Sequence, residues 1–228
     1  MIFPIFKLNI YKIIGSPKMK KKPSLLIIGN SNVGKSSITK LLLPNPKLFK
    51  GKAGKTPGST LLIKPIDQPN LPYCIVDLPG FGYMKHSSRR REEHIKKQIV
   101  GHIENNYKNY FLGLVIISIL RIEDEIEKYF IANKETIPLS FELIKFLKEF
   151  DIPIIVILNK IDKLSNFDKN KAVNSFIYSA GQFGLKLVHL DSYKKDTNDE
   201  IPYLEFSALK KFNLTKLRKV INNFLQCK

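Results

Sequence analysis

The stretch Gly29-Asn30-Ser31-Asn32-Val33-Gly34-Lys35-Ser36 decides the fold, because it fits the pattern G-x-x-x-x-G-K-[ST]. It follows a short apolar run at residues 24–28 and precedes a helix-like segment at residues 36–43. Glycines let the backbone wrap closely around an anion, with successive amides pointing inward, and the helix N-terminus adds positive charge. The sequence therefore predicts a phosphate-binding loop between a strand and a helix. An ordinary glycine turn is the alternative.

Apolar runs and helix-like patterns alternate along the rest of the chain. The candidate strands lie at residues 24–28, 61–66, 73–76, 112–120, 154–158 and 203–206. The candidate helices lie at residues 36–43, 89–107, 138–150, 168–180 and 214–225. Runs that are apolar on both faces are typical of a parallel sheet covered by helices. We therefore predict an α/β fold with a mostly parallel six-stranded sheet, helices on both faces, and a ligand beyond the carboxyl ends of the strands.

Composition narrows the class of protein. The chain has 228 residues, of which 43% are hydrophobic, so it can bury a sizeable core and is not a disordered chain. Its formal net charge of +18 favours a polyanionic partner, either nucleic acid or an anionic membrane surface; a lysine-rich composition without a partner is the alternative. The cysteines, Cys74 and Cys227, exclude a disulfide scaffold. They fit a reducing cytosol, so we expect a cytoplasmic protein.

The charge is concentrated near the N-terminus. The first 66 residues contain thirteen lysines and no acidic residue. Residues 1–15 are apolar and four lysines follow at residues 18–22, which is the reverse of a secretory signal. We therefore divide the chain into a basic and apolar arm, residues 1–22, and one domain, residues 23–228. A membrane-surface role for the arm and a translation start at Met19 remain open.

A second motif indicates which nucleotide the loop would bind. Asn159-Lys160-Ile161-Asp162 follows the apolar run at residues 154–158. The carboxylate of Asp162 can accept paired hydrogen bonds from N1 and N2 of guanine, which adenine does not offer, and Lys160 can lay its stem along the base. An N-K-x-D motif is weak alone, but downstream of a phosphate loop it favours GTP over ATP.

Three further segments supply groups for the phosphates, Mg²⁺ and the base. Asp77-Leu78-Pro79-Gly80 closes an apolar run, which suits a carboxylate that holds Mg²⁺ through water and a glycine amide on the γ-phosphate, although a Pro-Gly turn is the alternative. Thr60 could be a second Mg²⁺ ligand beside the hydroxyl of Ser36. Phe206-Ser207-Ala208 follows the last run and could offer backbone amides to guanine O6.

These elements, in this order, resemble a Ras-like P-loop GTPase domain of the translation-factor-related class. The stretches G-x-S-N-V-G-K-S-S, K-T-P-G-x-T and D-L-P-G-F-G-Y-M resemble the EngB (YihA) family of GTP-binding proteins, and residues 137–163 are similar to its archaeal branch. The resemblance covers residues 23–226 and implies a single, monomeric, Mg²⁺-dependent GTPase domain. It further implies a link to ribosome assembly, septation and cell division. Asn30 and Asn159 depart from the bacterial pattern, which has Arg and Thr there.

The motifs and the resemblance together place the nucleotide site on a defined set of residues. They are Gly29, Asn30, Ser31, Asn32, Val33, Gly34, Lys35, Ser36, Gly58, Ser59, Thr60, Leu61, Leu62, Asp77, Leu78, Pro79, Gly80, Asn159, Lys160, Ile161, Asp162, Phe206, Ser207 and Ala208. Within this set, Ser36 and Thr60 are the expected Mg²⁺ ligands. The expected catalytic residues are Lys35, Thr60, Gly80 and Asn32.

The sequence also predicts slow hydrolysis. In Ras a glutamine directly after D-x-x-G orients the attacking water, whereas this chain has Phe81, which has no polar side-chain atom. We expect in-line attack of a poorly positioned water on the γ-phosphate, and dependence on a partner. Asn32 matches the asparagine that holds K⁺ in related cation-dependent GTPases. Its alternative role is to cap the loop backbone.

Two classes of function remain open. The first is a GTP-controlled assembly factor that docks on RNA of the large ribosomal particle, with residues 47–55 and the helix from Arg89 as basic segments near the nucleotide. The second is a membrane- or septum-associated GTP-dependent scaffold, which only the N-terminal arm supports, so any membrane contact would be through that arm. Asp162 argues against a third class, a P-loop ATPase or kinase.

Overall fold

A computed structural model describes residues 22–49, 63, 65–80, 89–127, 137–194 and 199–227 of the chain. These residues form a six-stranded sheet in the order β2-β1-β3-β4-β6-β5, and each described strand pairing is parallel. The strands are β1 (Ser24–Gly29), β2 (Cys74–Asp77), β3 (Tyr110–Ser118), β4 (Ile154–Asn159), β5 (Lys186–His189) and β6 (Glu200–Phe206). The predicted α/β class and mostly parallel six-stranded sheet are confirmed.

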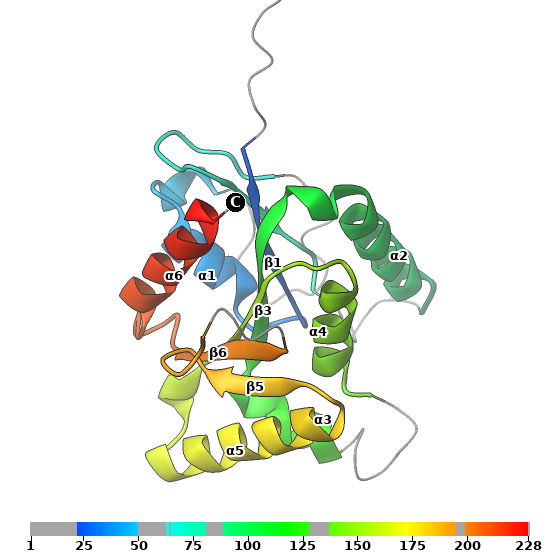
Figure 1. Cartoon of the computed structure of the whole chain (residues 1–228), viewed down its shortest axis with the longest axis vertical. Coiled ribbons are helices and arrows are strands. Elements are labelled where there is room, and N and C mark those ends of the chain that lie inside the picture. Colours follow the sequence, from blue (N-terminus) through cyan, green and yellow to red (C-terminus); the bar gives the residue numbers. More distant parts are fainter. Residues whose placement is uncertain are drawn as a thin grey trace, which may run out of the picture.

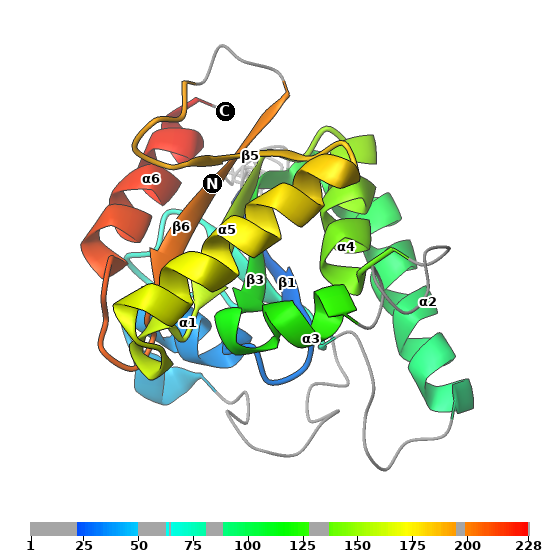
Figure 2. The ribbon, with the colours of Figure 1, turned by 90° about the horizontal axis from the view of Figure 1, so that it is seen from below.

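Helices cover both faces of the sheet (Figures 1 and 2). The helices are α1 (Lys35–Leu42), α2 (Arg89–Asn106), α3 (Ile122–Ile126), α4 (Leu139–Glu149), α5 (Asn166–Gln182) and α6 (Leu214–Gln226). Apolar side chains of α2, α3, α4 and α5 share one core with Leu26 and Ile28 of β1. Those of α1 and α6 share the other core with Leu25 and Ile27. Alternate residues of β1 thus enter opposite cores, which is why the strand is apolar throughout.

The structure differs from the sequence prediction at several elements. Strand β5 and the short helix α3 were not predicted. The predicted strand at residues 61–66 lies mostly outside the described residues, although Ile66 forms an antiparallel bridge with Ile75. Strand β3 ends at Ser118 rather than residue 120, because the chain turns there into a 3₁₀ helix, Ile119–Arg121.

The parallel arrangement gathers the predicted motifs at one edge of the sheet. The loops that follow β1, β2, β4 and β6 begin at the carboxyl ends of these strands, where doubly wound folds bind their ligands. No helix within the described ranges is long and apolar enough to cross a membrane. Residues 1–21, and with them the predicted membrane contact of the arm, lie outside the described residues.

Candidate nucleotide-binding site

Both glycines of the loop after β1 are required by close contacts. Gly29 and Gly34 have φ values of 150° and 103°. A Cβ atom on Gly29 would collide with the carbonyl of Ile116 in the neighbouring strand β3, and one on Gly34 would collide with the side-chain amide of Asn159. The glycines therefore let the loop lie against the sheet and against the loop after β4.

Lys35, the first residue of α1, turns back over this loop. Its Nζ atom donates to the carbonyls of Gly29, at 3.0 Å, and Asn30, at 2.8 Å. Burial lowers the pKa of Lys35 to about 8, and the nearby carboxylate of Asp77 opposes this shift. The ammonium group is thus held inside the loop and is only weakly stabilised there, so an incoming polyanion would strengthen its charged form.

The next carbonyls of the loop are bound by side chains from distant parts of the chain. The donors are Arg121 Nη1 to Ser31 O at 3.2 Å, Lys160 Nζ to Asn32 O at 2.6 Å, and Asn159 Nδ2 to Val33 O at 2.8 Å. Together with Lys35, they satisfy the carbonyls of residues 29–33. Protein donors therefore hold the backbone of the phosphate loop in place.

Two oxygen groups meet beside the loop in an arrangement that fits Mg²⁺. The hydroxyl of Ser36 donates to Asp77 Oδ2 at 3.2 Å. The other carboxylate oxygen, Oδ1, is buried and has no hydrogen-bond partner among the described residues. Burial raises the pKa of Asp77, and Lys35 opposes the shift. A hard cation with oxygen ligands would favour the ionised carboxylate, so these residues suit Mg²⁺. Thr60, the other predicted ligand, lies outside the described residues.

The loop after β2 packs directly on the phosphate loop. A Cβ atom on Gly80 would lie 2.6 Å from the hydroxyl oxygen of Ser31 and 2.9 Å from its amide nitrogen. Leu78 is buried, and its amide donates to the carbonyl of Ile27 at 2.9 Å. Gly80 is therefore held where its backbone faces the residues predicted to surround the phosphates, without room for a side chain.

Asn159 joins three loops. Besides its bond to Val33, its Oδ1 atom accepts a hydrogen bond of 3.0 Å from the amide of Ala208. The hydroxyl of Ser207 donates to Asp162 Oδ1 at 2.6 Å. The loops after β4 and β6 are thus fixed to each other and to the phosphate loop, which leaves Asp162 half-buried at a defined position.

Sequence reasoning missed two residues that shape the loop. Arg121 lies beside the loop, where it binds Ser31 and lowers the pKa of Lys160, a shift to which burial contributes most. Glu125 of α3 accepts a 2.5 Å hydrogen bond from Asn30 Nδ2, and its other oxygen accepts one from Ser140 at 2.6 Å. No motif marks either residue, since each acts through a contact across the fold.

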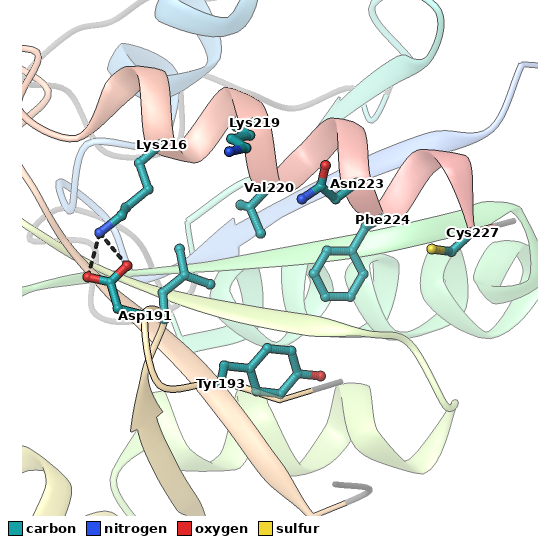
Figure 3. Close-up of a pocket in the computed structure, with 9 residues that line it drawn as sticks. Asp191, Tyr193, Lys216, Lys219, Val220, Asn223, Phe224 and Cys227 are labelled. Atoms are coloured by element: carbon teal, nitrogen blue, oxygen red, sulfur yellow. Dashed lines mark hydrogen bonds and ion pairs between the residues drawn. The ribbon is translucent and has the colours of Figure 1, made fainter. Parts of the chain in front are cut away.

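The predicted site residues thus fall into two groups. The structure brings together residues of the loops after β1, β2, β4 and β6. Gly58, Ser59, Thr60, Leu61 and Leu62 lie outside the described residues. A separate pocket of about 420 Å³ lies between α6 and residues 190–193 (Figure 3). It contains none of the predicted nucleotide-binding residues, and at one end Lys216 pairs with Asp191 at 2.6 Å.

Comparisons with known proteins show which family the chain is similar to. Residues 24–160 match the family model described as 50S ribosome-binding GTPase, and residues 129–227 match that of the elongation factor Tu GTP binding domain. A probable GTP-binding protein EngB of Methanococcus aeolicus is 33% identical over 160 residues, which are 70% of this chain and 67% of that protein. The counterpart from Pyrococcus horikoshii is 36% identical over 63% of this chain and 62% of its own length. The matched segment thus spans about two thirds of these relatives.

Solved structures give the same result. The crystal structure of a probable GTP-binding protein engB is 28% identical, with a TM-score of 0.68, and the match covers 90% of this chain and 99% of that one. Era in complex with MgGDPNP and a segment of 16S ribosomal RNA, at 22% identity and a TM-score of 0.51, shares the fold. The matched sequence families, the parallel sheet and the phosphate loop agree, and this chain therefore belongs to the EngB family of GTP-binding P-loop GTPases.

Proposed function

We propose that this protein binds GTP with Mg²⁺, hydrolyses it slowly to GDP and phosphate, and acts as a nucleotide-controlled assembly factor on the large ribosomal particle. The observation that carries the nucleotide part is the phosphate loop whose carbonyls, residues 29–33, are all bound by protein donors. Its amides would bind phosphate, and Asn159, the first residue of the predicted guanine motif, is hydrogen-bonded to it.

Phosphate binding rests on residues 29–36. The amides of the loop and the N-terminus of α1 would hold the β-phosphate. Lys35 would exchange its bonds to Gly29 and Asn30 for the β- and γ-phosphate oxygens, where it offsets charge in the transition state. Gly80 would donate its backbone amide to the γ-phosphate, and Asp162 would accept the hydrogen bonds of guanine N1 and N2.

The Mg²⁺ ion would be held by the hydroxyls of Ser36 and Thr60, with Asp77 binding it through water. When bound, the ion offsets negative charge on the β- and γ-phosphates. The buried oxygen of Asp77, which has no partner in the described part of the chain, supports this assignment.

Hydrolysis is expected to be slow because the residue after Gly80 is Phe81. Water would attack the γ-phosphorus in line with the bond to the β-phosphate, and that bond would break with its electron pair passing to GDP. The phenylalanine side chain at position 81 has no polar atom with which to orient the water. Asn32 is the candidate ligand of a K⁺ ion that would add positive charge here. Its carbonyl accepts from Lys160, so a cation already lies beside this residue.

The ribosomal part rests on charge and family. The net charge is +18, residues 1–66 contain no carboxylate side chain, and the matched family model is described as 50S ribosome-binding. The two family models together match residues 24–227, which supports one GTPase domain at residues 23–228 preceded by an arm at residues 1–22. We expect a monomer whose membrane contact, if it has one, is through the arm. The resemblance to the EngB family further implies a link to septation and cell division.

Sedimentation tests this proposal. Full-length protein is layered with purified large ribosomal particles on sucrose gradients of increasing salt, with GDP or with a non-hydrolysable GTP analogue. We expect co-migration with the GTP analogue that is lost as salt rises, because phosphate contacts weaken with salt. Lys35→Ala, which should not bind nucleotide, is the control. Flotation with anionic vesicles and no co-migration with particles in either nucleotide state would instead support the membrane scaffold.

A further inference from the structure

Exposed apolar side chains gather at the edge of the predicted guanine site. Phe167 is 78% exposed, Leu209 69% and Phe212 51%. Phe167 lies in the first turn of α5, which follows the loop after β4. Leu209 and Phe212 lie in the loop between β6 and α6. All three therefore flank the loops that carry Asp162 and Ser207. We call these three residues, together with Lys163, Lys210 and Lys211, the guanine-edge platform.

One contact between α5 and β6, and one within the loop between β6 and α6, anchor the segments of the platform. Lys169 of α5 forms an ion pair of 2.8 Å with Glu205 of β6. Ser207 forms an antiparallel bridge with Phe212, so the loop that carries Leu209 folds back on itself. The ion pair places the first turns of α5 beside the end of β6, from which the loop to α6 begins, and Figure 2 shows the start of α5 near this loop. The exposed side chains therefore belong to neighbouring, anchored segments.

The charge of the platform is positive. Lys163, Lys210 and Lys211 are exposed, and no ion pair of theirs occurs among the described residues. Of the carboxylates in the same segments, Glu205 is paired with Lys169, whereas Asp162 and Asp168 are, within the described ranges, bound only by the hydroxyls of Ser207 and Ser165 and keep their charge. Residues 162–169 and 205–212 thus carry four lysines against three carboxylates, a small positive excess. A polyanion would meet three lysines that have no described ion pair, beside exposed aromatic rings.

We propose that the guanine-edge platform binds an unpaired segment of ribosomal RNA, with bases stacked on Phe167 and Phe212 and phosphates near Lys163, Lys210 and Lys211. This inference rests on the proposed ribosomal function and names the surface that performs it. Aromatic rings beside lysines are the features with which proteins bind single-stranded RNA. A protein partner that needs an apolar surface would not require lysines without ion pairs beside the aromatic rings, so this combination favours RNA.

Two double variants separate stacking from charge. Binding of a fluorescein-labelled, mixed-sequence single-stranded oligoribonucleotide is titrated at several salt concentrations with GTP-analogue-loaded full-length protein. Phe167→Ala with Phe212→Ala should weaken binding roughly tenfold at every salt concentration, because stacking does not release counterions. Lys210→Ala with Lys211→Ala should lower the slope of log affinity against log salt by about 1.4, or roughly 0.7 for each lost phosphate contact.

The matched control is Tyr178→Ala, since Tyr178 is an aromatic residue of the same helix that is 67% exposed and lies outside the platform. It should leave RNA affinity unchanged, and each variant should bind GDP like the wild type. Duplex RNA of the same sequence should bind more weakly and be insensitive to the phenylalanine substitutions. Wild-type affinity for single strands in the phenylalanine variant would overturn the platform.

The same variants are then tested on ribosomal particles. If wild-type protein binds particles and the phenylalanine variant binds them equally well, the platform is wrong while the proposed function stands. If wild-type protein does not bind particles, the proposed function fails. If the variant loses particle binding but keeps its affinity for naked RNA, the surface contacts a ribosomal protein and the RNA assignment is overturned.

Discussion

The side-chain amide of Asn159 donates a 2.8 Å hydrogen bond to the carbonyl of Val33, and thereby joins the loop after β4 to the phosphate loop. The oxygen of the same amide accepts from Ala208 in the loop after β6. Both functional atoms of this buried side chain are therefore engaged within the protein. Asn159 holds the two ends of the nucleotide site at a fixed separation.

Asn159→Ala should destabilise the protein and weaken the binding of every nucleotide equally. The change leaves a buried carbonyl and a buried amide without partners, at a cost of about 2 kcal/mol. We expect the free energy of unfolding, measured by urea titration, to fall by that amount. The Kd of GDP and the Kd of GTP should rise by the same factor as each other. Asn166→Ala, an exposed position at the start of α5, is the control. An altered preference between guanine and adenine nucleotides at unchanged stability would contradict this role.

Asp162→Asn should change the base that the site accepts. The carboxylate is expected to bind the N1 and N2 donors of guanine, whereas an amide can donate to the carbonyl that xanthine has at position 2. GTP binding should therefore weaken sharply while binding of xanthosine triphosphate improves, as measured by competition titration. Asp168→Asn, a neighbouring exposed carboxylate, should change neither affinity. The assignment is wrong if the wild-type protein binds ATP as tightly as GTP.

Nucleotide binding near pH 8 should take up a proton at Lys35. In the free protein burial lowers the pKa of this group to about 8, and bound phosphates would favour the charged ammonium and raise the pKa. At pH 8 about half of the free protein would be deprotonated, so binding should take up about 0.5 proton, and affinity should fall as pH rises above 8.

Calorimetry of GDP binding at pH 8, in buffers that differ in ionisation enthalpy, measures this uptake directly. Lys35→Arg is the matched control, because arginine stays protonated at this pH, and its uptake should vanish. Equal apparent enthalpies in all buffers for the wild type would show that Lys35 is already fully charged.

Ser36→Ala should remove most of the effect of Mg²⁺ on GTP affinity. Adding EDTA to the wild type should weaken GTP binding, and the variant should respond little to either EDTA or Mg²⁺.

Burial raises the pKa of Asp77, so protonation of this group should weaken Mg²⁺ binding at a higher pH than for an ordinary aspartate. Titrations of Mg²⁺ at several pH values would test this effect of Asp77. Ser37→Ala, at the exposed next residue, is the control for Ser36→Ala. Full Mg²⁺ dependence in the Ser36 variant would refute the ligand assignment.

Deletion of residues 1–18 should leave GTP affinity unchanged. The described chain begins at Lys22, which forms a 2.7 Å ion pair with Asp67 and is retained in the deletion variant. Strand β1 begins at Ser24, so none of the sheet is removed. Nucleotide titration and thermal unfolding of the shortened protein measure the effect. A large loss of affinity or of Tm would show that the arm packs on the domain.

The sequence alone determined the phosphate loop, the α/β class and the positions of most elements. Long, mostly apolar runs such as β1, β3 and β4 could be predicted because strands buried on both faces leave few positions for polar side chains. Strand β5 was not predicted from the sequence because it is a four-residue edge strand whose first residue, Lys186, is exposed. Helix α3 was not predicted because its five residues are too few to show helical periodicity.

The tertiary structure decided how the site is held together. Arg121 and Asn159 bind the phosphate loop from 90 and 126 residues away, and Lys160 does so from 128. No local pattern could predict these bonds, because they depend on which strands are neighbours in the sheet and where each strand ends. Local sequence sets the conformation of a glycine-rich loop, but the donors that bind its carbonyls reach it only once parallel strands have placed distant loops at the same edge.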